Sequence, residues 1–288
     1  MICAGIDAGS RTLKAVLVEI MDRNGASAGM RVIAEAVRDQ QADQSALARS
    51  LLGELVRSCE VKPPVSLVAT GYGRQRTGMD ATTLTEITCQ AVGVRRLWPE
   101  VRTIIDIGGQ DCKVIALRPD GSVQDFTMND RCAAGTGRFL EMAAQKLDSD
   151  LDVLGQLAQD SVSAASITTT CAVFAESEII GLLAEGCPRA DIAAGVQASI
   201  AVRIARMAHP QWVEPVVFTG GVARVLGMRE ALEAAIGRAV LVPSSPQTTA
   251  ALGAAFLAAD LGHGSFEPLT NQPADIAGNN RKSQRGPT

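Results

Sequence analysis

The sequence predicts an α/β protein made of two domains that share one plan. The chief observation is a weak internal repeat: residues 5–20 (GIDAGSRTLKAVLVEI) and 104–117 (IIDIGGQDCKVIAL) each read as an apolar strand, a glycine turn and a second strand. A chain of 288 residues is also long enough for about two domains. In both repeats an aspartate before the turn is followed, at the same spacing, by a lysine, which gives the pairs Asp7 with Lys14 and Asp106 with Lys113.

Composition narrows the classes of function. Hydrophobic residues make up 47% of the chain and charged residues 20%, as expected of a soluble globular protein with buried cores. The formal net charge of -4 provides no basic field for a phosphate backbone, so nucleic-acid binding is not expected. Asp7 and Arg11 come before any apolar region long enough for a signal peptide, and no apolar run approaches the ~20 residues that span a bilayer. We therefore expect a cytoplasmic protein without membrane contact.

Three elements follow the first repeat. Residues 43–59 have helical periodicity, residues 65–70 read as a buried strand that ends in a glycine turn, and residues 85–97 read as a helix that stops before Pro99. These elements place the first domain at residues 1–100.

The second half is richer in helix. Helices are expected at 136–147, 172–185 and 192–208, a strand at 216–219, and a helix of small residues at 248–261. We assign residues 101–268 to the second domain, with the C-terminal helix packing back toward the first. Residues 269–288 have almost no apolar content and are expected to form a disordered tail.

The two glycine turns predict a nucleotide site. Backbone N–H groups of the first turn (Gly9, Ser10, Arg11) and of the second turn (Gly108, Gly109, Gln110) can hold phosphate oxygens from two sides, because glycine lets the backbone approach closely. Thr12 and Lys14, which follow the first turn, are also predicted to bind the nucleotide. Lys14 and Lys113 could equally be solvated strand residues. A single turn of this kind is usually only a hairpin, but two at matched spacing indicate nucleotide binding. Walker and Rossmann glycine motifs do not occur.

Further residues are assigned around these turns. Asp7 and Asp106 can hold Mg²⁺, directly or through water. Gly220 and Gly221 follow the strand at 216–219 and could lie against an adenosine. Gln110, or Asp111 beside it, could orient the water that attacks the γ-phosphate, although capping of the turn is an equally good explanation. The catalytic candidates are therefore Asp7, Asp106 and Gln110.

Two of the seven cysteines differ from the rest. Cys132 and Cys171 each lie just ahead of an expected helix, where free N–H groups and the helix dipole stabilise thiolates. A 4Fe–4S cluster takes four thiolates, so two copies of the chain could supply them around a dimer axis. Inert structural thiols are the commoner explanation of two such cysteines. The remaining five are expected to be buried or inert: Cys3, Cys59, Cys89, Cys112 and Cys187.

Seven ordered motifs resemble one known family over nearly the whole chain, to about residue 260. They are GIDAGS, ATGYGR (69–74), IDIGGQD (105–111), NDRCAAGTGRFLE (129–141), CAVFAESEII (171–180), TGGVA (219–223) and ALGAA (251–255). The family comprises the activators of 2-hydroxyacyl-CoA dehydratases and the ATPase subunits of ATP-dependent benzoyl-CoA reductases.

The resemblance implies a fold and a function. The fold is the actin-like ATPase fold with two ribonuclease-H-like halves. The implied cofactors are ATP or ADP, Mg²⁺ and a 4Fe–4S cluster shared between two subunits, with Cys132 and Cys171 as its ligands in each. The implied function is ATP-driven transfer of a low-potential electron into a dehydratase or reductase component. The implied partners are a second copy or a homologous ATPase subunit, that component, and a ferredoxin or flavodoxin-type donor.

Two alternatives share the fold. A sugar or acyl kinase would need a carboxylate base at the mouth of the cleft, for which Asp130 is the nearby candidate. A chaperone or filament protein would bind nucleotide without metal, and heat-shock-type chaperones carry a peptide-binding domain for which this chain is too short.

Overall fold

Two mixed β-sheets with the same strand order form the framework of the protein. The structure, a computed structural model, describes residues 1–23, 26–129, 132–168, 171–207 and 212–262, so Asp130 and the expected tail at 269–288 lie outside the described residues. The first sheet has the order β3 (Ala26–Asp39), β2 (Thr12–Arg23), β1 (Ile2–Ala8), β4 (Ser66–Thr70), β5 (Thr82–Thr83). The second has the order β8 (Val123–Asn129), β7 (Cys112–Leu117), β6 (Thr103–Ile107), β9 (Val216–Thr219), β10 (Val240–Leu241). The predicted duplication is therefore confirmed strand for strand.

The register of the two sheets repeats as well. β1 and β2 are antiparallel and place Asp7 opposite Lys14, and β6 and β7 are antiparallel and place Asp106 opposite Lys113. In each sheet the central strand is parallel to the next strand on its other side, β4 or β9. Each aspartate therefore stands at the carboxyl end of a central strand, beside a glycine turn.

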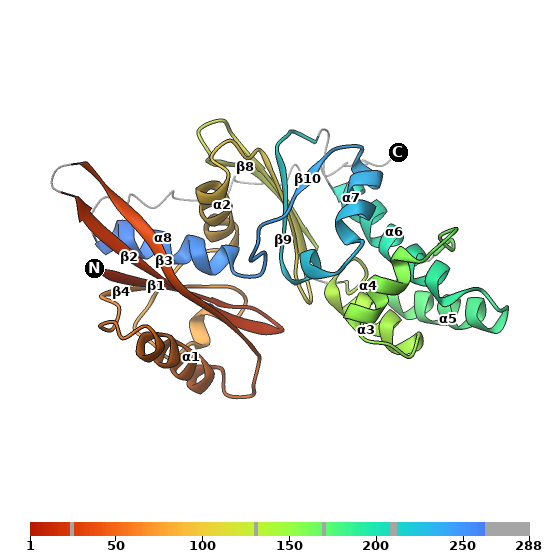
Figure 1. Ribbon diagram of the computed structural model, residues 1–288, viewed down its shortest axis with the longest axis horizontal. Helices are drawn as coiled ribbons and strands as arrows, with labels where there is room; N and C mark the ends of the chain where they lie inside the picture. Colours follow the sequence, from red (N-terminus) through yellow and green to blue (C-terminus); the bar gives the residue numbers. More distant parts are fainter. Residues whose placement is uncertain (24–25, 130–131, 169–170, 208–211, 263–288) are drawn as a thin grey trace, which may run out of the picture.

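Helices cover both faces of the first sheet. Alternate residues of β1 point to opposite faces, so Ala4 and Ile6 pack with α1 (Gln44–Ser58), whereas Cys3 packs with α8 (Thr249–Gly262). The small residues of α8 allow a very close approach: a Cβ on Gly5 would lie 2.0 Å from the carbonyl oxygen of Ala251. The C-terminal helix thus packs on the sheet formed by the first part of the chain (Figure 1).

One helix lies between the two halves. α2 (Glu86–Leu97) packs against α8 through Gly93, where a Cβ would lie 1.9 Å from the carbonyl oxygen of Thr249. On its other side Ala91 and Val94 join a core with Ile104 and Ile115 of the second sheet. α2 therefore connects both sheets, and Thr85 caps its first turn at the base of the space between them.

The other face of the second sheet carries a helical layer. It consists of α3 (Gly137–Lys146), α4 (Leu151–Gln159), α5 (Ala172–Ala184), α6 (Arg189–Met207) and α7 (Met228–Ile236). Two 3-10 turns complete the described elements, η1 (Arg74–Arg76) and η2 (Gly221–Arg224). No helix of the described residues is long and apolar enough to cross a membrane.

The expected helices and strands are confirmed within a few residues at each end, and α6 begins three residues before the expected Ile192. Four of the longer elements were not predicted: β3, β8, α4 and α7. β8 has five consecutive exposed residues, so neither of its faces is buried in a core, and the strand is held by its antiparallel pairing with β7, which no local pattern reveals.

Candidate functional site

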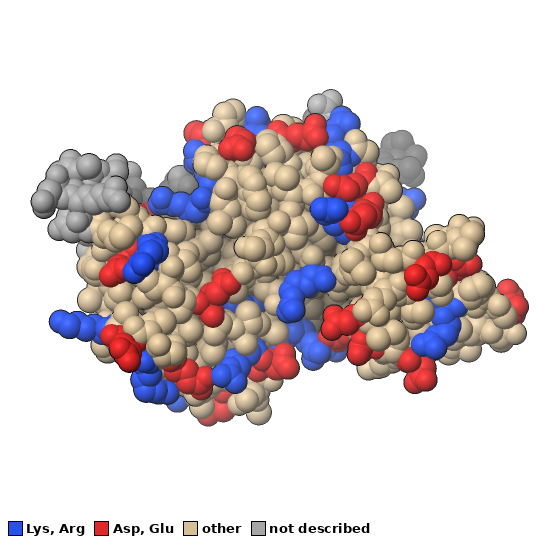
Figure 2. Space-filling model, in the orientation of Figure 1, with Lys and Arg blue, Asp and Glu red and all other residues tan. Residues whose placement is uncertain are grey.

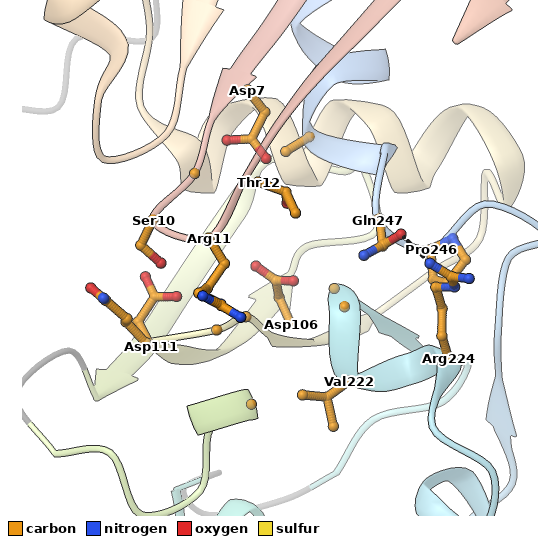
Figure 3. Close-up of a pocket in the computed structure, with 18 of the residues that line it drawn as sticks. Asp7, Ser10, Arg11, Thr12, Asp106, Asp111, Val222, Arg224, Pro246 and Gln247 are labelled. Atoms are coloured by element: carbon orange, nitrogen blue, oxygen red, sulfur yellow. Dashed lines mark hydrogen bonds between the residues drawn. The ribbon is translucent and has the colours of Figure 1, made fainter. Parts of the chain in front are cut away.

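A cavity of about 970 Å³ opens between the two sheets and is lined by both glycine turns. Figure 2 shows the hollow between the two halves, on a face where acidic and basic side chains are interspersed. Figure 3 shows Asp7 and Asp106, one from each sheet, pointing into the same space. Every residue predicted to act on the nucleotide lines this cavity: Asp7, Gly9, Ser10, Arg11, Thr12, Lys14, Asp106, Gly108, Gly109, Gln110, Gly220 and Gly221.

Asp7 offers one oxygen that the protein leaves unpaired. Its Oδ2 accepts a hydrogen bond from Lys14 Nζ at 2.8 Å. Burial alone would lower the pKa of Lys14, but the Asp7 carboxylate raises it above the ordinary value, so Lys14 stays charged. Oδ1 of Asp7 is buried and has no partner among the described residues. An unpaired buried acceptor costs about 1–3 kcal/mol, so this oxygen fits a cation or an ordered water as its partner.

Lys113 is the centre of a buried charge cluster. Its side chain is 2% exposed, and Nζ lies 2.8 Å from Asp111 Oδ2, 2.9 Å from Glu86 Oε1 and 3.5 Å from Asp106 Oδ2. Burial would lower the pKa of Lys113, but the three carboxylates hold it well above the ordinary value. The suggestion that Lys14 and Lys113 are solvated strand residues is therefore wrong, because both are held by carboxylates inside the cleft.

The second turn is hydrogen-bonded to the helical layer. The N–H of Gly108 donates to the carbonyl oxygen of Asp111 at 2.9 Å, so it closes the turn and is not available to a phosphate, contrary to expectation. The N–H groups of Gly137 and Arg138 donate to the carbonyl oxygens of Gly108 and Gly109 at 2.9 and 3.0 Å. The first turn of α3 therefore binds the glycine turn.

Arg11 crosses the cleft from the first turn. Its Nη2 lies 2.8 Å from Glu141 Oε1 on α3, and its aliphatic part covers Gly109, where a Cβ would lie 2.3 Å from Arg11 Cγ. Gln110 is exposed at the rim of the cavity, and the neighbouring Asp111 is engaged by Lys113. The second turn thus presents one neutral amide and one paired carboxylate.

The opposite wall contains residues that the sequence reasoning missed. β9 ends at Thr219, and at the next residue, Gly220, φ is +87° and an added Cβ would lie 2.3 Å from the Ile107 carbonyl oxygen, so a side chain does not fit. Arg224 Nη1 donates to Gln247 Oε1 at 2.8 Å across this wall (Figure 3). Arg224, Gln247 and Glu86 come from segments whose place in the cleft is set only by tertiary packing, so no local pattern marked them.

The cysteines fall into two groups. Cys3, Cys89 and Cys112 are buried, and burial raises the pKa of Cys89 to about 12 and that of Cys112 to about 11. Cys59 and Cys187 are only partly buried, so they do not lie in a core, and their inertness stays a prediction. Cys132 and Cys171 are also partly buried.

Cys132 and Cys171 precede two helices that pack together. Cys171 is the N-cap residue of α5, as expected. Cys132, in contrast, is not the N-cap of α3: it lies five residues before Gly137, the first residue of that helix, and the N-cap is Thr136. The expectation that α3 directs its free N–H groups at Cys132 is therefore incomplete, because the first two of them bind the second turn. α3 and α5 lie side by side and are joined by an ion pair of 2.6 Å between Lys146 and Glu176 (Figure 1).

Comparison with known proteins gives a family and close structural relatives. Residues 4–258 match the sequence profile of the BadF/BadG/BcrA/BcrD ATPase family. An activator of lactoyl-CoA dehydratase from Anaerotignum propionicum is 42% identical over 260 residues, which cover 90% of this chain and 97% of the relative.

Two solved structures are similar over nearly their full length. Component A of (R)-2-hydroxyglutaryl-CoA dehydratase from Acidaminococcus fermentans has a TM-score of 0.83 at 37% identity, covering 91% of this chain and 99% of that one. The activator of 2-hydroxyisocaproyl-CoA dehydratase from Clostridium difficile, with bound ADPNP, has a TM-score of 0.81 at 38% identity, covering 92% and 97%. The kinase alternative is not favoured by these relatives. The chain belongs to the BadF/BadG/BcrA/BcrD ATPase family and has its actin-like ATPase fold.

Proposed function

We propose that this ATPase activates a 2-hydroxyacyl-CoA dehydratase by passing it a low-potential electron through a 4Fe–4S cluster. Two copies of the chain would hold the cluster, each through Cys132 and Cys171. A dehydratase is favoured over a benzoyl-CoA reductase because the relatives described above are all dehydratase activators or components.

One observation carries the proposal: the second turn and the Cys132 segment are joined by a few hydrogen bonds. Gly137 and Arg138 tie α3 to the second turn. On the other side, Asn129 Nδ2 donates to the carbonyl oxygens of Cys132 and Ala134 at 3.1 and 3.3 Å, which holds the backbone at these two residues to the end of β8. A shift of the second turn on ATP hydrolysis would therefore move the segment that contains Cys132.

The residues around the cysteines fit a shared cluster. Val173 and Phe174, two and three residues after Cys171, are 69% and 67% exposed, which is unusual for large apolar side chains and suits a covering second copy. A 4Fe–4S cluster, when bound, supplies one-electron transfer, and its potential depends on helix dipoles and solvent. The chain's own part is to supply two thiolates and to change their surroundings with nucleotide state.

The nucleotide end of the proposal uses the cleft. The first and second turns would bind the phosphates, and Asp7 and Asp106 would hold Mg²⁺, for which the unpaired Asp7 Oδ1 is the supporting observation. Gln110 at the rim would help to orient water, and Gly220 and Gly221 would lie against the adenosine. A ferredoxin or flavodoxin-type protein would reload the cluster in the cytoplasm, where cysteines stay reduced.

The test is iron and acid-labile sulfide per chain in protein purified without oxygen. The wild type is expected to contain about two irons per chain, one cluster for two copies, and the Cys132→Ala, Cys171→Ala double variant almost none. The matched control is Cys59→Ala with Cys187→Ala, which removes the two other partly buried thiols and should keep the iron. An iron-free wild type that still binds ATP would overturn the electron-transfer function.

A further inference from the structure

We propose that Glu86 is a catalytic carboxylate of ATP hydrolysis, which accepts a proton from the attacking water, and that Lys113 is the positioning residue that holds it. This role rests on the ATPase activity of the family and does not depend on the proposed cluster. The two proposals can therefore fail separately.

Glu86 enters the cleft from an element that belongs to neither turn. It is the first residue of α2, the helix between the two halves, and its position is fixed by the Thr85 cap. Its side chain lines the same cavity as the two glycine turns. Glu86 therefore faces the space between the two glycine turns, from a third direction.

Lys113 fixes one oxygen of Glu86 and leaves the other available. Oε1 accepts a hydrogen bond from Lys113 Nζ at 2.9 Å, while Oε2 has no protein partner among the described residues. The side chain is 25% exposed, so the cavity reaches it. A carboxylate held by one oxygen, with the second open to a cavity, has the geometry required to accept a hydrogen bond from water.

The other carboxylates near Lys113 have different positions. Asp106 and its counterpart Asp7 stand beside the turns, where a metal bound to phosphates would lie, and Asp111 is part of the second turn, with Oδ2 engaged by Lys113 at 2.8 Å. Four carboxylates here face two lysines, Lys14 and Lys113. Burial raises the pKa of Glu86 to about 7, opposed by Lys113 and assisted by Asp7, Asp106 and Asp111, so Glu86 suits proton transfer near neutral pH.

Gln110 cannot replace Glu86 in this role. A neutral amide can orient a water molecule, but it cannot accept the proton that the water loses. Gln110 is also exposed at the rim of the cavity, whereas Glu86 is held by the buried side chain of Lys113. The two residues would therefore act in succession, with Gln110 orienting and Glu86 accepting.

Hydrolysis forms one bond to the γ-phosphorus and breaks another. The water oxygen bonds to that phosphorus, and the bond from the phosphorus to the bridging oxygen breaks, with its electron pair remaining on the β-phosphate of ADP. One water proton passes to Glu86 Oε2, and the other stays on the inorganic phosphate. Glu86 then returns its proton to solvent through the 25% of its side chain that is exposed.

The test compares Glu86→Gln with Asp152→Asn in the full chain. Both variants remove one negative charge from a residue that lines the cavity, but Asp152 is an exposed residue of α4. Single-turnover hydrolysis of ATP is expected to fall about 100-fold or more in Glu86→Gln and less than about twofold in Asp152→Asn. Binding of a fluorescent ADP analogue is expected to stay within about threefold of wild type in both, corresponding to about 0.6 kcal/mol.

A second variant separates catalysis from folding. Glu86→Ala leaves a space for a small carboxylate, so sodium formate is expected to restore its hydrolysis at least about tenfold, and acetamide is not. Hydrolysis by Glu86→Gln within about threefold of wild type would overturn the proposal. So would equal losses of hydrolysis and ADP binding together with no response to formate, because Glu86 would then have a structural role.

Discussion

Arg11 and Glu141 form a bridge across the nucleotide cleft, with Arg11 Nη2 2.8 Å from Glu141 Oε1. The bridge links the turn of the first sheet to α3, the helix that also binds the second turn through Gly137. Both glycine turns are therefore connected to the helix that follows Cys132, one through a side chain and the other through the backbone.

The bridge itself is expected to be weak. The side chains of Arg11 and Glu141 are 54% and 30% exposed, so water screens the pair, and a double-mutant cycle of Arg11→Ser and Glu141→Gln should give a coupling of about 0.2–1 kcal/mol in urea unfolding. The surface pair Arg31 and Glu19, also 2.8 Å apart, should give a similar value as a control. A coupling above about 2 kcal/mol would show that the cleft is locked rather than loosely bridged.

Lys113→Met should destabilise the protein strongly. Removing the cation leaves Glu86, Asp106 and Asp111 to repel one another, and loss of one member of a buried ion pair costs about 3–5 kcal/mol. We expect the lower end of that range, because Glu86 and Asp111 are 25% and 28% exposed. Urea unfolding of the nucleotide-free protein measures the effect.

Lys146→Met is the matched control, because its pair with Glu176 is 35% and 38% exposed and should contribute less than about 1 kcal/mol. Similar losses in the two variants would contradict the central role given to Lys113.

Gly220→Ala should impair nucleotide binding. Its φ is +87°, and a Cβ would lie 2.3 Å from the Ile107 carbonyl oxygen and 2.7 Å from Asp106 Oδ1, so the second sheet must shift at the cleft. We expect at least about tenfold weaker binding of ADP, or about 1.4 kcal/mol, by titration calorimetry.

Gly237→Ala is the control that separates the effect of backbone strain from the effect of the Cβ clash at Gly220. Gly237 also has a positive φ of +66°, but nothing lies within 4 Å of a Cβ there. This variant should lose about 1–2 kcal/mol of stability and keep its affinity for ADP. Equal affinity losses in both variants would rule out the contact explanation.

The buried thiols should resist alkylation in the folded protein. Burial raises the pKa of Cys3, Cys89 and Cys112, and because the thiolate is the reactive form, these residues stay protonated and unreactive at about pH 8. Mass spectrometry after iodoacetamide treatment should find them modified only in urea. Rapid modification of Cys89 in the native protein would show that the α2–α8 contact opens readily.

The sequence by itself determined the duplicated architecture and the two glycine turns that line the cleft. The matched spacing from Asp7 to Lys14 and from Asp106 to Lys113 is a local property, because one strand, one tight turn and the next strand fix the register without help from the rest of the chain. The strand before Gly220 was also predictable from the sequence, because its apolar run and the glycine that follows it are local features.

Tertiary structure decided what surrounds those turns. Lys113 looks solvated in the sequence, yet its ammonium meets carboxylates from α2, β6 and the second turn. The N–H group of Gly137 could not be assigned to the second turn from the sequence, because only the folded structure places it 2.9 Å from the Gly108 carbonyl oxygen. Local spacing fixes the neighbours along a strand, whereas the partners of a buried charge or an unpaired helix N–H depend on which distant segments the packing of two sheets and one intervening helix brings together.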